Sequence, residues 1–189
     1  MRNKVLIAMA LLLVGTFLIF CRNVYGAIDT WIDIDIKNTN GFKSYMGYKS
    51  LTHSDLPQAK LQEICTTDEN GFRRCTGRYV IAVGSGVGGQ VGDCVDVILE
   101  NGTSIPCVIG DYKDDKHTDG SNLVGRANGC CSEFIVDVDL LRDDIKNKGD
   151  VSVVNVYWNS PVVKIRRYIF NCLKGGLVND FKEVAVQYD

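Results

Sequence analysis

Four aspartates and one histidine gather between residues 111 and 119, in the stretch IGDYKDDKHTDGSN. A carboxyl group beside other carboxylates has its pKa raised by like-charge repulsion, which suits a general acid near neutral pH. His117 lies two residues from Asp115 and two from Asp119, so either carboxylate can orient its ring. Such a set suits proton transfer to a leaving oxygen, as in glycosidic cleavage, or activation of water. We therefore predict Asp111, Asp115 and His117 as catalytic residues.

Two other interpretations use the same side chains. Asp111, Asp115, Asp119 and His117 offer oxygen and nitrogen ligands for Ca²⁺, Mn²⁺ or Zn²⁺. A calcium-loop motif does not fit, because the central glycine and the closing glutamate are missing. Alternatively, the aspartates only form turns and caps in a solvated loop. Spacing alone leaves all three interpretations open, and any metal or cofactor is unknown.

The elements that must position this loop are strands. The Asn101-Gly102 pair joins two apolar runs and is a strong signal for a tight hairpin. The acidic loop follows the second run directly, at the end of a strand. The pattern indicates a mainly β fold, a small closed or nearly closed barrel with one or two short helices. Strands are predicted in RYVIAVGSG (78–86), DCVDVIL (93–99), SIPCVIGD (104–111), SEFIVDVD (132–139) and VVKIRRYIF (162–170).

Two helices are predicted between the strands. Residues 57–64 suit a short helix with Pro57 in its first turn. Residues 137–149 place Val138, Leu141 and Ile145 at helical spacing and end at Gly149. The glycines of residues 84–93 precede a strand rather than a helix, so we interpret this segment as an inter-strand loop and not as a phosphate loop.

The N-terminus has the layout of an export segment. The basic residues Arg2 and Lys4 precede 17 apolar residues, Val5 to Cys21, and the chain turns polar at Arg22. Residues 1–26 are thus a signal peptide cleaved after Gly26 or a retained membrane anchor; both place the rest on the extracellular face, secreted or single-pass anchored. We divide the remainder into an extended linker or docking arm, residues 27–56, and a β-barrel domain, residues 57–189. The alternating Ile and Asp of residues 28–36 also fit a half-buried strand.

Charge and cysteine content limit the function further. The exported part has 18 basic and 23 acidic residues, a net charge of −5, which argues against nucleic acid as a partner. Seven cysteines remain after residue 26, and export permits disulfides, although an odd number leaves one unpaired. Cys65 and Cys75 flank the turn signal Asp68-Glu69-Asn70-Gly71, so a hairpin would bring them near each other as a disulfide.

The order of motifs resembles the double-psi β-barrel group, which includes the bacterial 3D domain, expansins, rare lipoprotein A and membrane-bound lytic transglycosylase A. The segments GRYVIAVGSG, GDCVDVILENGTSIPCVIGD, DDKHTDGSN and CCSEFIVD carry this resemblance. A closer likeness is to an uncharacterised family of exported proteins of Firmicutes and their phages, over residues 42 to 168. The resemblance implies a six-stranded double-psi-like barrel after the N-terminal signal or anchor helix.

The resemblance also implies a role at the cell wall, with peptidoglycan or another polysaccharide as the partner and membrane contact through an uncleaved N-terminal segment. In active members an acidic residue on the barrel protonates the glycosidic oxygen. By position, Asp111 matches the first family aspartate and Asp137 the last, and Asp119 and Asp137 are assigned to substrate binding. The usual Asp-x-Gly-Gly is absent after Asp111. Two hypotheses therefore stay open. One is a lytic transglycosylase-like or glycan hydrolase activity. The other is a non-catalytic surface-binding or assembly module with a metal-binding or structural loop.

Overall fold

The computed structural model describes residues 31–53 and 55–174 of the 189-residue chain. The expected signal or anchor, residues 1–26, lies outside these ranges. Within them, no helix combines the length and apolar character needed to cross a membrane. The strands are β1 (Trp31–Asp35), β2 (Ser44–Gly47), β3 (Thr66–Thr67), β4 (Arg73–Cys75), β5 (Arg78–Gly84), β6 (Asp93–Leu99), β7 (Ser104–Lys113), β8 (Ser132–Val136) and β9 (Val162–Asn171). The α-helices are α2 (Pro57–Ile64) and α3 (Asp143–Lys148), and short 3₁₀ turns are η1 (Tyr48–Leu51), η2 (Ser85–Val87), η3 (Asp115–His117), η4 (Val151–Val154), η5 (Val156–Trp158) and η6 (Cys172–Lys174).

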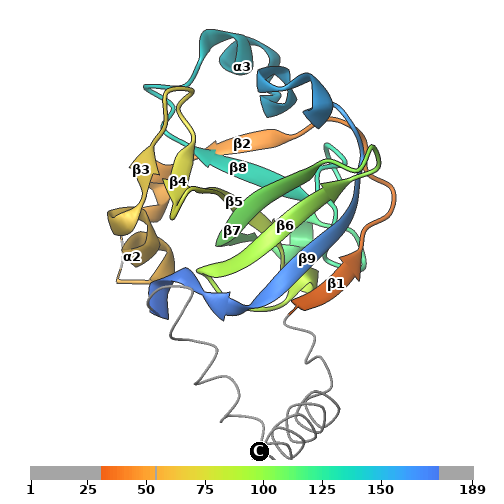
Figure 1. Ribbon diagram of the computed structural model, residues 1–189, viewed down its shortest axis with the longest axis horizontal. Helices are drawn as coiled ribbons and strands as arrows, with labels where there is room; N and C mark the ends of the chain where they lie inside the picture. Colours follow the sequence, from red (N-terminus) through yellow and green to blue (C-terminus); the bar gives the residue numbers. More distant parts are fainter. Residues whose placement is uncertain (1–30, 54, 175–189) are drawn as a thin grey trace, which may run out of the picture. The chain divides into compact units, whose positions relative to one another are not determined.

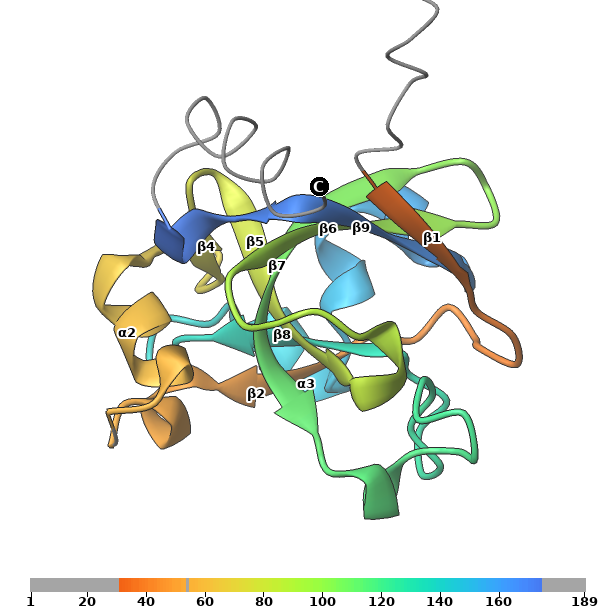
Figure 2. The same cartoon turned by 90° about the horizontal axis from the view of Figure 1, so that it is seen from below.

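The strands form one mixed sheet that curves around the core (Figures 1 and 2). Its main path runs β1-β9-β6-β7-β5-β4-β3, and β8 joins β5 while also pairing with β2. The pairs β5–β7 and β2–β8 are parallel, and the other pairs are antiparallel. The prediction of a mainly β fold with two short helices is confirmed. Over the described residues the sheet has nine strands rather than the expected six: the five ranges predicted as strands form β5 to β9, and β1 to β4 lie outside those ranges.

Residues assigned to a linker or docking arm belong partly to this sheet, so the predicted domain boundary at residue 57 falls inside the fold. β1 pairs with β9 and β2 pairs with β8. The strand was the better interpretation of the alternating pattern, although Ile34 is the one residue of β1 that is partly buried and the other four are exposed. Ile34 contacts the core, and Asp33 pairs with Lys164 and Arg166 of β9 at 3.0 and 2.7 Å.

The local signals for turns and helices are confirmed. β6 and β7 form the predicted hairpin, and Gly102 at its tip adopts φ +84°, a left-handed conformation that glycine tolerates. Helix α2 begins with Pro57 as predicted. Helix α3 ends at Gly149, with φ +67°, but begins only at Asp143, because residues 137–140 form a turn instead. The glycine-rich segment forms η2 and a loop before β6.

Two apolar clusters lie on opposite faces of the sheet. The larger one takes side chains from β5 to β9 and includes Ile81, Val97 and Phe134, which are fully buried. The smaller one lies under α2 and includes Leu61, Val80 and several cysteines. Successive residues of β5 alternate between the two clusters, as the two-residue period of a strand requires.

A buried lysine fixes the segment between β1 and β2. Lys43 is 1 % exposed, and its Nζ donates hydrogen bonds to the carbonyl oxygens of Gly41, Trp158 and Ser160 at 3.0, 2.5 and 2.9 Å. Desolvation of the ammonium lowers the pKa of Lys43. The three carbonyls satisfy all three N–H groups of the ammonium, so this charge joins the N-terminal segment to the turn before β9.

A bulge at Gly110 sets the direction of the end of β7. The β5–β7 register runs Ile81 to Ile109 and then Ala82 to Asp111, skipping Gly110. Ile105, Cys107 and Ile109 of β7 face the larger apolar cluster, and in a regular strand Asp111 would face it too. The bulge reverses this direction, so that Asp111 points away from that cluster. A Cβ on Gly110 would meet Val80 Cγ1 at 2.3 Å and Ile135 Cδ1 at 2.7 Å.

We expect Gly110→Ala to destabilise the fold by about 1–3 kcal/mol, because the added methyl overpacks the sheet beside two core side chains. Urea unfolding monitored by circular dichroism measures the change. Gly120→Ala is the matched control, since a Cβ there meets no atom within 4 Å. Equal stability of the two variants would contradict the packing constraint at Gly110.

Candidate functional site

A pocket of about 320 Å³ opens where β5 and β7 end and β8 begins. Ala82 and Met46 contribute apolar surface. The polar and charged side chains that line it are Asp111, Tyr112, Lys113, Asp114, His117, Asn128 and Glu133. Of the three predicted catalytic residues, Asp111 and His117 therefore share one pocket, whereas Asp115 is not among its lining residues.

Two carboxylates flank one alanine in this pocket. Ala82 of β5 is in register with Asp111 of β7 on one side and with Glu133 of β8 on the other. Residues in register on neighbouring strands present their side chains on the same face. Because the methyl group of Ala82 is small, the space between the two acidic side chains stays open.

Each of the two carboxylates has a different partner. Gln58 Nε2 of α2 donates a hydrogen bond to Asp111 Oδ1 at 3.2 Å. Lys113 Nζ lies 3.1 Å from Glu133 Oε1 and also donates to the carbonyl oxygen of Cys130 at 3.3 Å. The Lys113 side chain is only 8 % exposed, so its positive charge is directed into the pocket and not toward solvent.

His117 and Asp115 belong to the short turn η3 at the outer end of the loop. His117 is exposed, and its backbone N–H donates to Asp114 O while its carbonyl accepts from Arg126 N–H, both at 2.9 Å. Asp115 Oδ1 accepts from the Ser85 hydroxyl at 2.6 Å, which directs it toward η2. The imidazole is thus available at the rim of the pocket, and Asp115 ties the loop to the end of β5.

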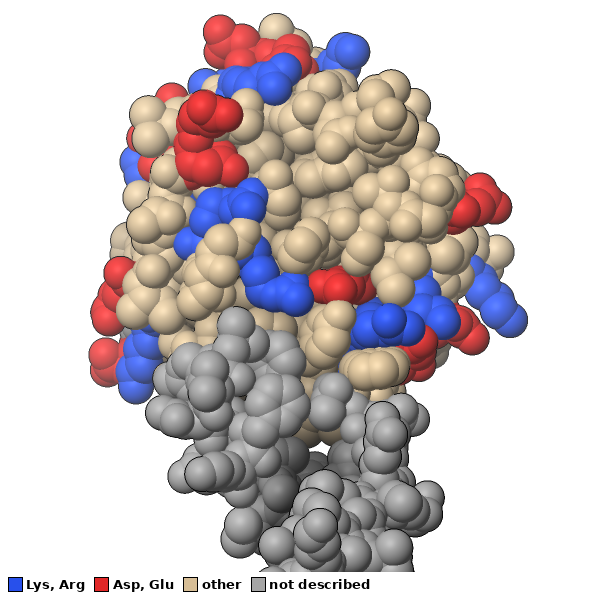
Figure 3. Space-filling model, viewed as in Figure 1, with Lys and Arg blue, Asp and Glu red and all other residues tan. Residues whose placement is uncertain are grey.

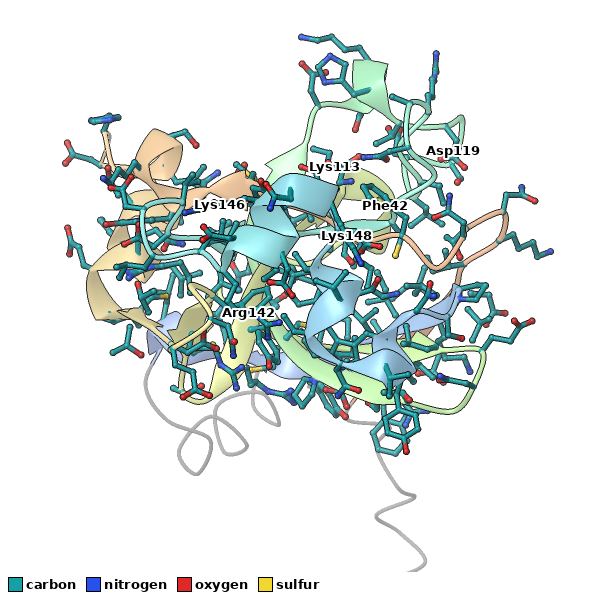
Figure 4. The ribbon with its side chains drawn as sticks, turned by 90° about the horizontal axis from the view of Figure 1, so that it is seen from above. Phe42, Lys113, Asp119, Arg142, Lys146 and Lys148 are labelled. Carbon is teal, nitrogen blue, oxygen red and sulfur yellow. The ribbon has the colours of Figure 1, made fainter. Side chains whose placement is uncertain are left out.

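Asp119 organises the loop. Its Oδ1 accepts hydrogen bonds from the backbone N–H groups of Leu123 and Val124 at 3.0 and 3.3 Å, and both oxygens accept from the Ser121 hydroxyl. Figure 4 shows Asp119 within the loop, beyond Lys113 at its base. These bonds hold the pKa of Asp119 below its usual value. The bond from Leu123 N–H contributes most, followed by the one from the Ser121 hydroxyl. Lys116 likewise lowers the pKa of Asp114. At these two aspartates hydrogen bonds outweigh the like-charge repulsion that the sequence led us to expect.

Asp137 lies away from the pocket. It follows the C-terminal end of β8, four residues after Glu133, or roughly 13 Å along an extended strand. Its N–H donates to Gly71 O at 2.8 Å, and its Oδ1 accepts from Asp139 N–H at 3.1 Å. The two residues assigned to substrate binding, Asp119 and Asp137, are therefore not brought together, and both act in turns.

The residues that the structure describes contain no group of three or more His, Cys, Asp or Glu arranged to hold a metal ion. Asp111, Asp115 and Asp119 direct their oxygens to three different partners, Gln58, Ser85 and the loop backbone. A common metal would require these oxygens to converge, so their arrangement gives the metal interpretation no support.

Sequence reasoning missed Glu133 and Lys113. Glu133 is the one charged residue inside the apolar run of β8, and Lys113 continues the same face of β7 two residues after Asp111. Because a charged residue within an apolar strand is unusual, Glu133 could have been selected from the sequence as a candidate site residue. Its position opposite Ala82 depends on the pairing of β5 with β8, two strands about fifty residues apart in the sequence.

Cys65 and Cys75, the predicted disulfide pair, carry free thiols here, as do the other five cysteines in the described ranges. The hairpin that was expected to join them is present as β3 and β4. Thr66 pairs with Arg74, so one further step of the same antiparallel register places Cys65 opposite Cys75.

Neither the protein-family models nor the curated proteins compared with this chain give a match. The double-psi group remains a resemblance of motifs, and the chemistry of the site is argued from its own geometry.

We expect Asp119→Asn to destabilise the chain by about 1–2 kcal/mol at neutral pH, because a neutral amide accepts the Leu123 and Val124 N–H groups more weakly than a carboxylate does. The folded pKa of Asp119 lies below the 3.8 of an unperturbed aspartate. Its contribution is therefore complete above about pH 4 and is lost as the pH falls through the folded pKa.

Urea unfolding of wild type and Asp119→Asn, compared at pH 7 and near pH ~2.5, measures this difference. It should be large at pH 7 and shrink in acid. Asp114→Asn, at an exposed carboxylate of the same loop, should change stability less. A pH-independent difference would contradict the role of the charge.

Proposed function

We propose that this protein is an exported, cell-surface enzyme that cleaves or remodels peptidoglycan or a related glycan. The observation that carries the proposal is the pair of carboxylates, Asp111 and Glu133, facing each other across Ala82 in one pocket. Most glycosidases cleave the glycosidic bond with two carboxyl groups on opposite sides of it, one to donate a proton and one to stabilise or activate. The sequence predicted Asp111 or Asp115 as the general acid with His117 assisting, and the pocket adds Glu133 as a second carboxylate.

The spacing of the pair supports this chemistry. Asp111 and Glu133 are two strands apart, which separates their backbones by about 10 Å at the usual strand spacing of about 4.8 Å. Side chains that lean toward one another close part of that distance. The resulting separation suits a sugar and a water molecule between the carboxyl groups, since inverting enzymes hold theirs about 6.5–9.5 Å apart.

The surroundings of each carboxylate assign the roles. Lys113 neutralises the charge of Glu133 at 3.1 Å, and Glu133 is therefore assigned as the ionised group that activates water or stabilises positive charge on the sugar. No salt bridge among the described residues involves Asp111, whose partner is the neutral amide of Gln58. Asp111 is assigned as the general acid. His117 and Asn128 on the pocket wall supply hydrogen bonds to sugar hydroxyls.

Features of the sequence support the proposed location and partner of the enzyme. A signal peptide or anchor at residues 1–26 and a net charge of −5 after it suit an extracellular polysaccharide better than nucleic acid. Acidic and basic side chains are interspersed on the face drawn in Figure 3, without one continuous basic surface. The motif order of the double-psi barrel group adds the expectation of a cell-wall substrate.

A second candidate function is a surface-binding or assembly module without catalysis. The observation that favours it is that several acidic side chains are already engaged: Asp115 by Ser85, Asp119 by the loop backbone and Glu133 by Lys113. In this case the pocket would bind a glycan through the same polar groups and leave it intact.

Incubation of the full-length protein, purified in detergent, with peptidoglycan should release muropeptides that chromatography and mass spectrometry detect. Asp111→Asn and Glu133→Gln should each reduce the rate by about 10²–10⁴-fold, the usual contribution of a general acid or base. Asp115→Asn is the matched control and should retain most activity, because Asp115 faces Ser85. Thermal melting of each variant checks that the fold is kept.

Binding to cell-wall sacculi without released products would favour the binding module. Products that Asp111→Asn and Glu133→Gln release at the wild-type rate would refute the assigned site while leaving the reaction in place.

A further inference from the structure

Four cysteines from separate parts of the chain meet in the smaller apolar cluster. Cys65 follows α2, Cys75 ends β4, Cys94 lies in β6 and Cys172 follows β9. The sulfur atoms of Cys94 and Cys172 are 3.7 Å apart. Neither the predicted Cys65–Cys75 pair nor the glycan pocket accounts for this convergence.

Cys75 connects the two pairs. It packs in the same apolar cluster as Cys65 and Cys172, and its hydrogen bonds with Cys172 and Cys65 lower its pKa. The register of β3 and β4 places Cys65 directly opposite Cys75. Directly opposed residues of antiparallel strands have Cβ atoms about 4.5–5.5 Å apart, so a small movement reaches the roughly 3.5–4.5 Å of a disulfide. The sulfur contacts therefore run in one row: Cys65, Cys75, Cys172, Cys94.

The four thiols differ in access to solvent. Cys65, Cys75 and Cys94 are 8 %, 1 % and 3 % exposed, whereas Cys172 is only partly buried. Cys172 Sγ also donates to Gly92 O at 2.9 Å. A small reagent in solution therefore meets the row at Cys172.

We propose that these cysteines form a thiol–disulfide exchange site, in which Cys172 reacts with an external disulfide and oxidation ends with the bonds Cys94–Cys172 and Cys65–Cys75. The external reactant is a small disulfide such as oxidised glutathione or cystine. An exported protein meets such oxidants, so the compartment expected from the N-terminus suits the chemistry. The site is separate from the glycan pocket and does not depend on its activity.

The first bond forms in two exchanges. Hydrogen bonds to Cys75 and Cys94 raise the pKa of Cys172, so Cys172 first passes its proton to the Cys75 thiolate beside it. Cys172 then attacks one sulfur of the small disulfide, forms a mixed disulfide and releases one small thiolate. The Cys94 thiolate then attacks the Cys172 sulfur, and the second small thiolate leaves. The protein gives up two protons and two electrons, and the small disulfide takes them up as two thiols.

The second bond forms by transfer along the row. The Cys75 thiolate attacks the Cys172 sulfur of the first bond and releases Cys94, and Cys65 then attacks Cys75 and releases Cys172. A second small disulfide reoxidises Cys172 and Cys94. Hydrogen bonds from Cys172 and Cys65 lower the pKa of Cys75, which favours the thiolate that this transfer requires.

Cys107, Cys130 and Cys131 serve as internal controls for oxidation of the four cysteines in the row. Burial raises the pKa of Cys107 and of Cys130, and it raises that of Cys131 to about 11. Cys107 and Cys131 belong to the larger apolar cluster and Cys130 to neither cluster, so none of the three lies in the row with Cys172. These three cysteines should therefore remain thiols while the row is oxidised.

Peptide mapping of the full-length protein tests the site. The reduced protein is exposed to oxidised glutathione, quenched by alkylation and digested with trypsin and a glutamate-specific protease. Cleavage at Arg73 and Arg74 separates Cys65 from Cys75, and cleavage at Glu100 separates Cys94 from Cys107. Mass spectrometry should find linked peptides for the two proposed pairs. Thiols that stay reduced at these four positions, or links to Cys107, Cys130 or Cys131, would overturn the proposal.

The order of exchange is tested by three variants. Cys172→Ala removes the entry point and should slow formation of the Cys65–Cys75 bond by at least about tenfold. Cys94→Ala should still form that bond, because Cys75 can resolve the mixed disulfide at Cys172. Cys107→Ala is the matched control and should oxidise at the wild-type rate. A wild-type rate in Cys172→Ala, or loss of Cys65–Cys75 in Cys94→Ala, would refute the row.

Discussion

The parallel pairing of β5 with β7 is the constraint on which the rest of the structure depends. Parallel neighbours need a connection that crosses from one end of the sheet to the other, and here residues 85–103 supply it, with β6 forming a hairpin with β7 on the return. Both strands consequently end at the same edge of the sheet. Because β8 runs antiparallel to β5, it begins at that edge, so Glu133 meets the strand ends that carry Asp111 and Lys113.

The pocket combines this topology with one local irregularity. The bulge at Gly110 removes Asp111 from the row of core residues and aligns it with Ala82. A carboxylate in the larger apolar cluster would carry a heavy desolvation cost, whereas at the pocket it faces Gln58 and solvent. Lys113 then offsets the charge of Glu133, one of the three carboxylates that line the pocket with Asp111 and Asp114.

The thiol row lies on the face of the sheet opposite the larger core, the face that also carries Ala82 and Glu133. Successive residues of β5 and β7 point alternately to the two faces, so Val80 and Val108 pack beside the cysteines while Ile81 and Ile109 pack in the larger core. The row joins α2, β4, β6 and the end of β9, segments that local hydrogen bonds alone would not hold together. The proposed thiol exchange and the proposed glycan cleavage therefore involve separate sets of residues.

Much of the fold was determined by local sequence, because short-range signals have short-range physical causes. Asn101-Gly102 specifies its hairpin, Pro57 starts α2, Gly149 ends α3, and the apolar runs form β5 to β9. The sequence also predicted that the acidic loop follows a strand. Two of the predicted site residues, Asp111 and His117, do line one pocket. The strand pattern of residues 31–35 was readable too, although its partner β9 was not.

Only the tertiary structure decided which residues meet. The pairing of β8 with β5 brings Glu133 to Asp111, and the skipped residue at Gly110 changes the face to which Asp111 points. The convergence of Cys75, Cys94 and Cys172 likewise joins positions up to 97 residues apart. The periodicity of a sequence predicts which residues of a strand share a face. Register and bulges, however, are set by packing between distant segments, and a shift of one residue moves a side chain to the other face.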